Sequence, residues 1–257
     1  MIVRKSAFNK SETKAQTTYI SAVQQLNKNG EYTKFVNWHA NMGGFRMHGM
    51  GYPEDVGVIR FLAWHRIFLI RFEKALQKYE PSVYIPYWKW VDGGIPKWIE
   101  KFEPTVKGVT RLKGSHMSLK PTFQKPKAET VNRNTVTSAI TTQKNIDRIL
   151  NYTRYNEFST ALERGPHNRG HMRIGGVMQT EVSPADPMFW LHHANVDRIW
   201  ALWQKKNPTK HPEIIAAKGA KPATAKAFVS TWSTLQPFGV SLSSASKPTT
   251  TMGYSYA

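Results

Sequence analysis

The chain has 257 residues, of which 40% are hydrophobic, enough for one globular domain with a substantial core or at most two small ones. Its 36 Lys and Arg against 17 Asp and Glu give a formal net charge of +19. The positive residues are scattered, however, and no RRM, zinc-finger or helix-turn-helix pattern accompanies them, so we expect no specific nucleic-acid partner. The absence of cysteine excludes disulfides, thiolate-ligated metals and cysteine nucleophiles, so a metal site must use histidine and carboxylate ligands, which suit copper, zinc or iron.

Apolar residues at helical spacing predict three helices in the first third of the chain. The first covers 11–28, with Ser11 as its N-cap, and a shorter one covers 31–41. The glycine-rich segment 42–57 is predicted to be a loop, and a long helix follows over 58–79.

Helical signals are sparse in the middle of the chain. The segment 81–142 begins with an aromatic, proline-containing stretch, and its polar and basic part, 107–134, is expected to be an exposed excursion. Two short helices are then predicted over 143–150 and 154–163.

The strongest helix start lies at Asp186 and Pro187, an N-cap residue followed by proline at the first helical position. This helix is predicted to continue through Trp203 and to stop before Pro208. The tail after Pro222 is rich in Ser, Thr and Lys, with only short apolar pieces. The chain as a whole is therefore expected to be mainly α, with irregular connections and minor β.

A group of histidines in the second half predicts a metal site. His167 and His171 are four residues apart and can face one ion from the same side of a helix, although such a pair alone is weak evidence. His193 supplies a third imidazole from the helix that starts at Asp186. Because adjacent helical residues point about 100° apart, His192 and His193 cannot both face that ion.

An earlier group of histidines predicts a second ion. His39 and His65 each follow a tryptophan, and His48 lies in the loop between them. Taken alone, each is more simply a buried core histidine; taken with the later group, they favour a pair of metal ions. Imidazole-only sites with open positions suit copper redox chemistry. The two remaining histidines, His116 and His211, are expected at the surface.

Together with several neighbouring motifs, these histidines resemble those of the bacterial tyrosinases, members of the type-3 copper family that includes catechol oxidases and molluscan haemocyanins. The resemblance spans nearly the whole chain and is most specific around the later histidines. The matching pieces are Trp38-His39, Phe61-Leu62-Ala63-Trp64-His65-Arg66, Ile85-Pro86-Tyr87-Trp88-Lys89-Trp90, Gly165-Pro166-His167-Asn168-Arg169-Gly170-His171, the stretch 186–200 and the closing Gly253-Tyr254-Ser255-Tyr256. It implies one domain over 1–257, with a helical-bundle core that holds two copper ions and uses O2.

Carried over by position, the resemblance implies three ligands for the second copper, namely His167, His171 and His193, whereas His192 matches a neighbour that is not a ligand. For the first copper, His39 and His65 resemble the first and third ligands.

The middle ligand of the first copper is where the chain departs from the family pattern. The family places it nine residues before the third ligand, where this chain has Val56, which cannot bind copper. His48 is the one histidine between His39 and His65 and is assigned in its place; the opposing interpretation is an incomplete first site.

The implied activity is O2-dependent ortho-hydroxylation of monophenols and oxidation of o-diphenols to o-quinones. The resemblance also implies a Glu and an Asn that hold a proton-accepting water, and Glu163 and Asn168 fit these positions. The simpler interpretation is that Asn168 caps a helix and Glu163 pairs with a nearby arginine. Two functional alternatives stay open: a catechol oxidase without the hydroxylation step, and a haemocyanin-like O2-binding protein.

Partners and location are expected from what the chain lacks. No apolar run is long enough for a membrane helix and no Sec-type signal is visible, so we expect no membrane partner and a cytoplasmic location. Because the chain ends at the closing motif without the extension that plugs the pocket in many relatives, a separate copper-loading partner protein is expected, besides small phenolic or catecholic substrates.

Overall fold

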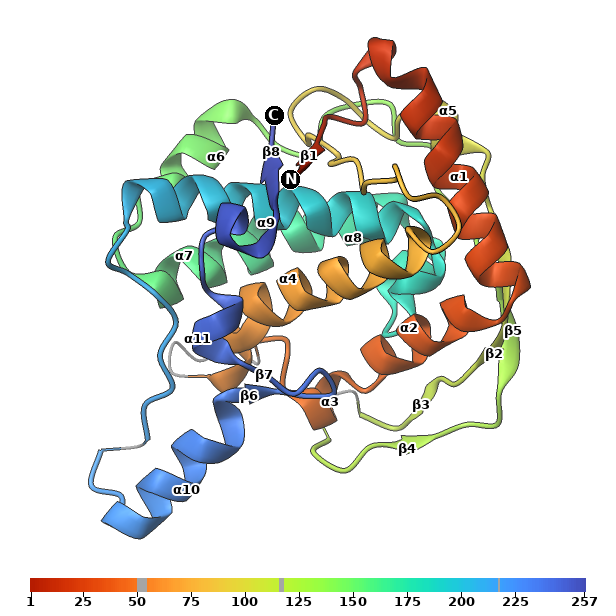
Figure 1. Cartoon of the computed structure of the whole chain (residues 1–257). Helices are drawn as coiled ribbons and strands as arrows, with labels where there is room; N and C mark the ends of the chain where they lie inside the picture. Colours follow the sequence, from red (N-terminus) through yellow and green to blue (C-terminus); the bar gives the residue numbers. More distant parts are fainter. Residues whose placement is uncertain (50–54, 116–117, 217) are drawn as a thin grey trace.

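Two long helices, α4 (Val56–Leu76) and α9 (Met188–Lys206), lie side by side at the centre of the molecule (Figure 1). Helix α4 is buried along almost its whole length and also packs against α7 (Tyr155–Leu162) and α1 (Thr13–Lys28). Helix α2 (Glu31–Ala40) packs on α1. The computed structural model describes residues 1–49, 55–115, 118–216 and 218–257.

The remaining elements are short. The other helices are α3 (Met42–Phe45), α5 (Lys97–Glu100), α6 (Gln143–Leu150), α8 (Asn168–Ile174), α10 (Pro222–Trp232) and α11 (Leu242–Ala245). The strands are β1 (Ile2–Arg4), β2 (Thr105–Val109), β3 (Leu112–Lys113), β4 (Thr122–Phe123), β5 (Lys127–Thr130), β6 (Thr234–Leu235), β7 (Val240–Ser241) and β8 (Tyr254–Tyr256). In the described parts they form two-stranded pairs, of which only β1–β8 is parallel. The prediction of a mainly α chain with minor β is confirmed.

Aromatic side chains fill the space between α2, α4 and α9. The rings of Phe72 and Trp190 stack in parallel, and Phe35 and Phe68 close around them edge-on or tilted. All four side chains are buried, and large aromatic surfaces of this kind contribute most to core stability. The core therefore fixes how the histidine-bearing faces of these helices meet.

Three sequence predictions need correction at their boundaries. Helix α1 starts at Thr13 rather than at residue 11, because a 3-10 turn precedes it. The side chain of Asn9 caps this turn by accepting a hydrogen bond from the backbone N–H of Ser11, and α1 itself has no side-chain cap. The predicted loop 42–57 contains α3, and α4 begins at Val56, capped by Asp55.

The tail contains a helix, α10, that was not predicted from the sequence. Helix α10 begins with Pro222 at its first position, and it has no buried residue. Phe228, Val229 and Trp232 are partly buried and pack against the core at helical spacing, a short periodic signal that the sequence analysis overlooked in the Ser-, Thr- and Lys-rich tail.

The segment 107–134, predicted to be an exposed excursion, packs partly against helix α2. Strands β2 and β5 form a ribbon that lies against α2, with Val106 and Val109 buried beneath it. The side chains of Thr33 and Asn37 on α2 donate hydrogen bonds to the backbone of this ribbon.

Of the two histidines expected at the surface, His211 is exposed and His116 lies outside the described residues. In the part of the chain that the structure describes, no helix could span a membrane.

A buried charge network joins the two chain ends to the central helices. Asp197 on α9 accepts hydrogen bonds from Arg66 on α4 and from the hydroxyls of Tyr254 and Tyr256, the latter two at 2.6 Å. Arg4 on β1 pairs with Glu73 of α4 at 3.0 Å. Although burial opposes ionisation, Arg66 and Arg4 hold the pKa of Asp197 below its ordinary value.

Replacing Asp197 by Asn should therefore lower the free energy of unfolding by about 3–5 kcal/mol, because the buried Arg66 loses its carboxylate partner, whereas Arg4 keeps Glu73. Urea or thermal unfolding measures this loss. Asp147→Asn, at an exposed position of α6, is the matched control and should change stability by less than about 0.5 kcal/mol. Equal stability of the two variants would contradict a structural role for the network.

Candidate metal centre

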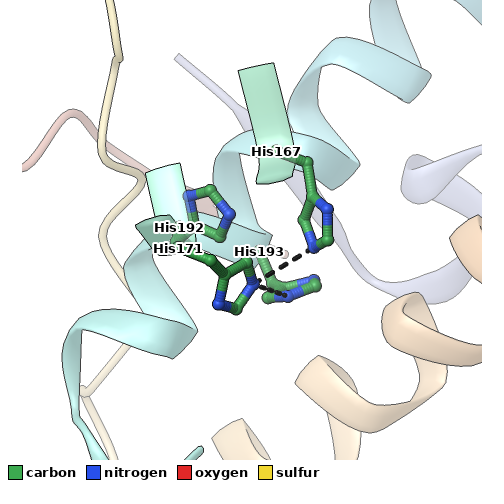
Figure 2. A group of neighbouring side chains, drawn as sticks. All are labelled: His167, His171, His192 and His193. Atoms are coloured by element: carbon green, nitrogen blue, oxygen red, sulfur yellow. Dashed lines mark hydrogen bonds between the residues drawn. The ribbon is translucent and has the colours of Figure 1, made fainter. Parts of the chain in front are cut away.

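The later histidines meet at the junction of three elements. His167 ends the segment Glu163–His167, which connects α7 to α8 through a kink at Gly165, and His171 lies one turn further on in α8. Their Nε2 atoms are 3.2 Å apart, and the Nε2 atom of His193 on α9 lies 3.4 Å from that of His171. Figure 2 shows these three rings converging, whereas no such contact reaches His192.

The earlier histidines converge as well. His39 comes from α2 and His65 from α4, and both are almost completely buried. His48 comes from the segment after α3, and one ring nitrogen from each of the three histidines lies within 4.8 Å of the other two. The His48 ring makes edge contacts with the rings of His39 and His65.

The two groups adjoin each other. The rings of His65 and His193 stack with their centroids 4.3 Å apart, so α4 and α9 place one member of each group face to face. Phe61 packs against rings of both groups, and so does Phe189. These two apolar rings exclude water from the interior side of the histidine groups.

Hydrogen bonds set the tautomer of most of these histidines. A carbonyl oxygen can only accept, so a ring nitrogen facing one must carry the proton. The Nδ1 atoms of His39, His65 and His171 face the backbone oxygens of Glu181, Phe61 and Met178 at 2.6–2.8 Å. Their Nε2 atoms are therefore left with free lone pairs.

Two further imidazoles follow the same rule. His167 has Nδ1 at 2.9 Å from Asn168 Oδ1 and 3.1 Å from the Glu163 carbonyl, and His48 has Nδ1 at 3.0 Å from a carboxylate oxygen of Glu163. For His193, no hydrogen-bond partner of Nδ1 exists among the described residues.

The pKa of the buried histidines is shifted so that they stay neutral. Burial, reinforced by neighbouring imidazoles, lowers the pKa of His39, His65, His167 and His193 well below its ordinary value. Burial lowers the pKa of His171 to about 4. Neutral imidazoles are the form that binds metal.

This arrangement fits a metal ion better than it fits a packed core. The buried Nε2 atoms of His39, His48 and His65 have no hydrogen-bond partner in the described structure. In the later group, unprotonated Nε2 atoms face one another at hydrogen-bond distance. Orphaned lone pairs of this kind are costly inside a protein, and a cation between them removes that cost.

A cavity of about 400 Å³ opens onto both groups. Its wall includes His39 and His48 from the earlier group and His167 and His171 from the later one. The site is thus sealed on one side by phenylalanine rings and open on the other to a small molecule.

Comparisons with known proteins agree with this geometry. Residues 29–206 match the family model described as the common central domain of tyrosinase. A tyrosinase of Streptomyces galbus is 33% identical over 218 residues, covering 74% of this chain and 79% of the relative. One of Streptomyces lincolnensis is 34% identical over 187 residues, covering 62% and 67%.

The chain belongs to the tyrosinase family.

Solved structures show the same fold at lower identity. A functional unit of octopus haemocyanin superposes with a TM-score of 0.63 at 23% identity, covering 100% of this chain and 68% of that one. The tyrosinase of Burkholderia thailandensis gives a TM-score of 0.55 at 18% identity, covering 100% and 73%. As a tyrosinase-family member, the chain is a copper-dependent oxidoreductase that uses O2 and acts on phenols, as the sequence predicted.

Val56 occupies the position at which the resemblance places the middle ligand of the first copper. Val56 is buried and starts α4, so it packs rather than faces the histidines. The backbone of His48 lies directly on this helix start: a Cβ atom at Gly57 would come within 1.8 Å of the His48 carbonyl oxygen. Glycine at 57 therefore allows the backbone of His48 to lie against the start of α4.

The two predicted catalytic residues both contact candidate ligands. Oε1 of Glu163 accepts hydrogen bonds from Nδ1 of His48 and from the backbone N–H of Gly49, each at 3.0 Å. Asn168 accepts from His167 and lies in the cavity wall, whereas Glu163 is buried behind His48. The simpler expectation, that Glu163 pairs with an arginine, is wrong.

His192 has the opposite tautomer. The indole N–H of Trp90 donates to its Nδ1 at 3.1 Å, so the proton of the neutral ring is on Nε2 and that atom has no lone pair for a metal. Gly170 makes room for this ring, since a Cβ atom there would lie 2.3 Å from His192 Cε1. Sequence reasoning missed the roles of Trp90, Gly57 and Gly170. Gly170 lies inside the His167–His171 motif and Trp90 inside the aromatic stretch 85–90, whereas no pattern marked Gly57.

We expect ¹⁵N NMR of the copper-free protein, labelled at histidine, to show His192 as the Nε2–H tautomer and His39, His65 and His171 as Nδ1–H. The imidazole shifts distinguish the two forms directly. Trp90→Phe removes the indole donor and should change the shifts of His192 alone. A shared tautomer for all four rings in the wild type would contradict the hydrogen-bond assignment.

Proposed function

We propose that the chain is a tyrosinase that hydroxylates monophenols at the ortho position and oxidises the resulting catechols to o-quinones. The observation that carries the proposal is the cavity that opens onto both histidine groups, because it admits a small phenol to a site with two metal-binding groups. A pure O2 carrier has no need of such access. The proposed ligands are His39, His48 and His65 for one copper and His167, His171 and His193 for the other.

Bound copper supplies the activation of O2 and the electron transfer of both reactions. The protein holds the imidazoles through the oxygens on their Nδ1 atoms, and Phe61 and Phe189 keep water out from the inner side. The phenol enters from the cavity, past Asn168 and His167.

The phenol must also lose a proton, and its pKa of about 10 makes this unfavourable at neutral pH. We assign the proton acceptance to Glu163, through a water shared with Asn168. Glu163 at the same time holds His48 in place through Oε1. It thus has two roles that can be separated by experiment.

A copper-loading partner protein stays a prediction from the family resemblance.

His48 is tested by copper content. His48→Gln should lower the bound copper from about two ions per chain to about one, because the first group would keep only two imidazoles. His211→Gln, at an exposed position away from both groups, is the control and should retain the full content. Metal analysis after extensive dialysis measures both, and full occupancy in His48→Gln would remove this residue from the ligand set.

Glu163 is tested by a pair of substitutions. In Glu163→Gln the amide oxygen can still accept from His48 and Gly49, so copper binding should persist, whereas loss of the carboxylate base should slow tyramine hydroxylation about 100-fold or more. Catechol oxidation also releases protons but forms no new C–O bond, and we expect it to be slowed less than tyramine hydroxylation. Glu163→Ala removes both roles and should also lose copper.

Rates on tyramine and on a catechol, measured beside the copper content, distinguish the roles of Glu163. Wild-type hydroxylation by Glu163→Gln would rule out the base. A wild-type protein that oxidises the catechol but never hydroxylates tyramine, even after the lag, is a catechol oxidase, and the proposed hydroxylation would be wrong.

A further inference from the structure

The cavity that opens onto both histidine groups has a single carboxylate in its described wall. Besides the histidines, the wall consists of three methionines, four uncharged polar residues and Glu181. Carboxylates are scarce in a chain whose net charge is +19, and this one lies where a substrate would enter. Its charge therefore acts on the molecule that occupies the cavity.

Glu181 is held at both its backbone and its side chain. Its backbone oxygen accepts from Nδ1 of His39 at 2.8 Å, and its Oε1 accepts from the backbone N–H of Leu112, in β3, at 3.0 Å. Nδ1 is the nitrogen of His39 that faces away from a metal ion, so Glu181 stands one imidazole ring outside the histidine group. The residue is only partly buried, and an ionised carboxylate has room for further donors.

Neighbouring charges do not cancel that of Glu181. Arg111, beside Leu112, interacts electrostatically with Glu181. However, Arg111 already forms a two-pronged ion pair with Glu129, with N···O distances of 2.6 and 2.7 Å. Among the described residues, Glu181 itself forms no ion pair. One cation and two carboxylates leave a net negative charge beside the cavity.

We propose that Glu181 makes the cavity selective for phenols and catechols that carry a cationic amine on a short para side chain, the phenylalkylamine type, over those that carry a carboxylate. The reacting hydroxyl must lie at the histidines, so a para substituent points back towards the cavity wall. There an ammonium group meets an opposite charge, whereas a carboxylate meets a like one. The thioethers of Met42, Met172 and Met178 suit the aromatic ring between these two ends.

The substrate class rests on the proposed function, and its test uses catechols so that it does not depend on the hydroxylation step. Dopamine, neutral 4-ethylcatechol and 3-(3,4-dihydroxyphenyl)propionate differ mainly in the charge of the side chain. Initial O2 uptake by the copper-loaded protein gives kcat/KM for each. Glu181→Gln should lower the ratio of the dopamine value to the propionate value about fivefold, with 4-ethylcatechol in between. The amide still accepts from Leu112, so the wall keeps its shape.

Glu157→Gln is the matched control, because it makes the same change in net charge at an exposed position of α7 outside the described cavity wall. It should keep the wild-type ratio. An unchanged ratio in Glu181→Gln, or an equal fall in Glu157→Gln, would overturn the role of Glu181.

Binding separates this inference from the proposed function. Phenethylamine and 3-phenylpropionate have no ring hydroxyl and cannot react, and NMR titration of the copper-loaded protein gives a Kd for each. Glu181→Gln should weaken the binding of phenethylamine relative to that of 3-phenylpropionate by a similar factor. If this change occurs but no catechol is oxidised, the charge selection stands and the proposed enzyme activity is wrong. If catechols are oxidised and neither ratio changes, the activity stands and the charge selection is wrong.

Discussion

The ion pair between Arg66 and Asp197 sets the register of the two central helices, and the metal centre depends on that register. Arg66 directly follows His65 on α4, and Asp197 lies one helical turn after His193 on α9. The ion pair between Arg66 and Asp197 therefore brings His65 and His193 together, and the rings of these two histidines stack. The two chain ends stabilise the same contact, since Tyr254 and Tyr256 donate to Asp197. A buried charge pair gives little net stability but a well-defined geometry, which is what two adjoining metal sites require.

Within this scaffold the protein controls chemistry through which ring nitrogen carries a proton. Backbone oxygens on Nδ1 leave Nε2 of His39, His65 and His171 unprotonated. The single indole donor of Trp90 reverses the arrangement in His192. Two adjacent histidines on α9 thus differ in what they can bind, and the difference comes from partners outside that helix. Such outer hydrogen bonds orient metal ligands and are part of the site.

The segment around His48, a proposed copper ligand, is held in the fold by two contacts outside any helix of its own. Gly57 opens space at the start of α4, and Glu163 fixes the imidazole through Oε1. A ligand carried by a connecting segment needs such a partner, because no helix orients its ring. The proposed double role of Glu163 therefore links the holding of the first copper to the proton transfer at the phenol.

Much of this protein could be predicted from the sequence because its signals are local. The periodicity of α4 and α9, the Asp186-Pro187 start and the spacing of His167 and His171 each depend on residues near in the chain, and they led to the mainly α fold, the family and its copper chemistry. Helix α10 escaped this reasoning because its apolar stripe, Phe228, Val229 and Trp232, is short and only partly buried. The tautomer of each histidine and the approach of His48 depend on partners up to 142 residues away in the chain, as for His39 and Glu181. Only the tertiary structure decides these, because sequence spacing does not determine which distant donor, acceptor or counter-charge will meet a buried side chain.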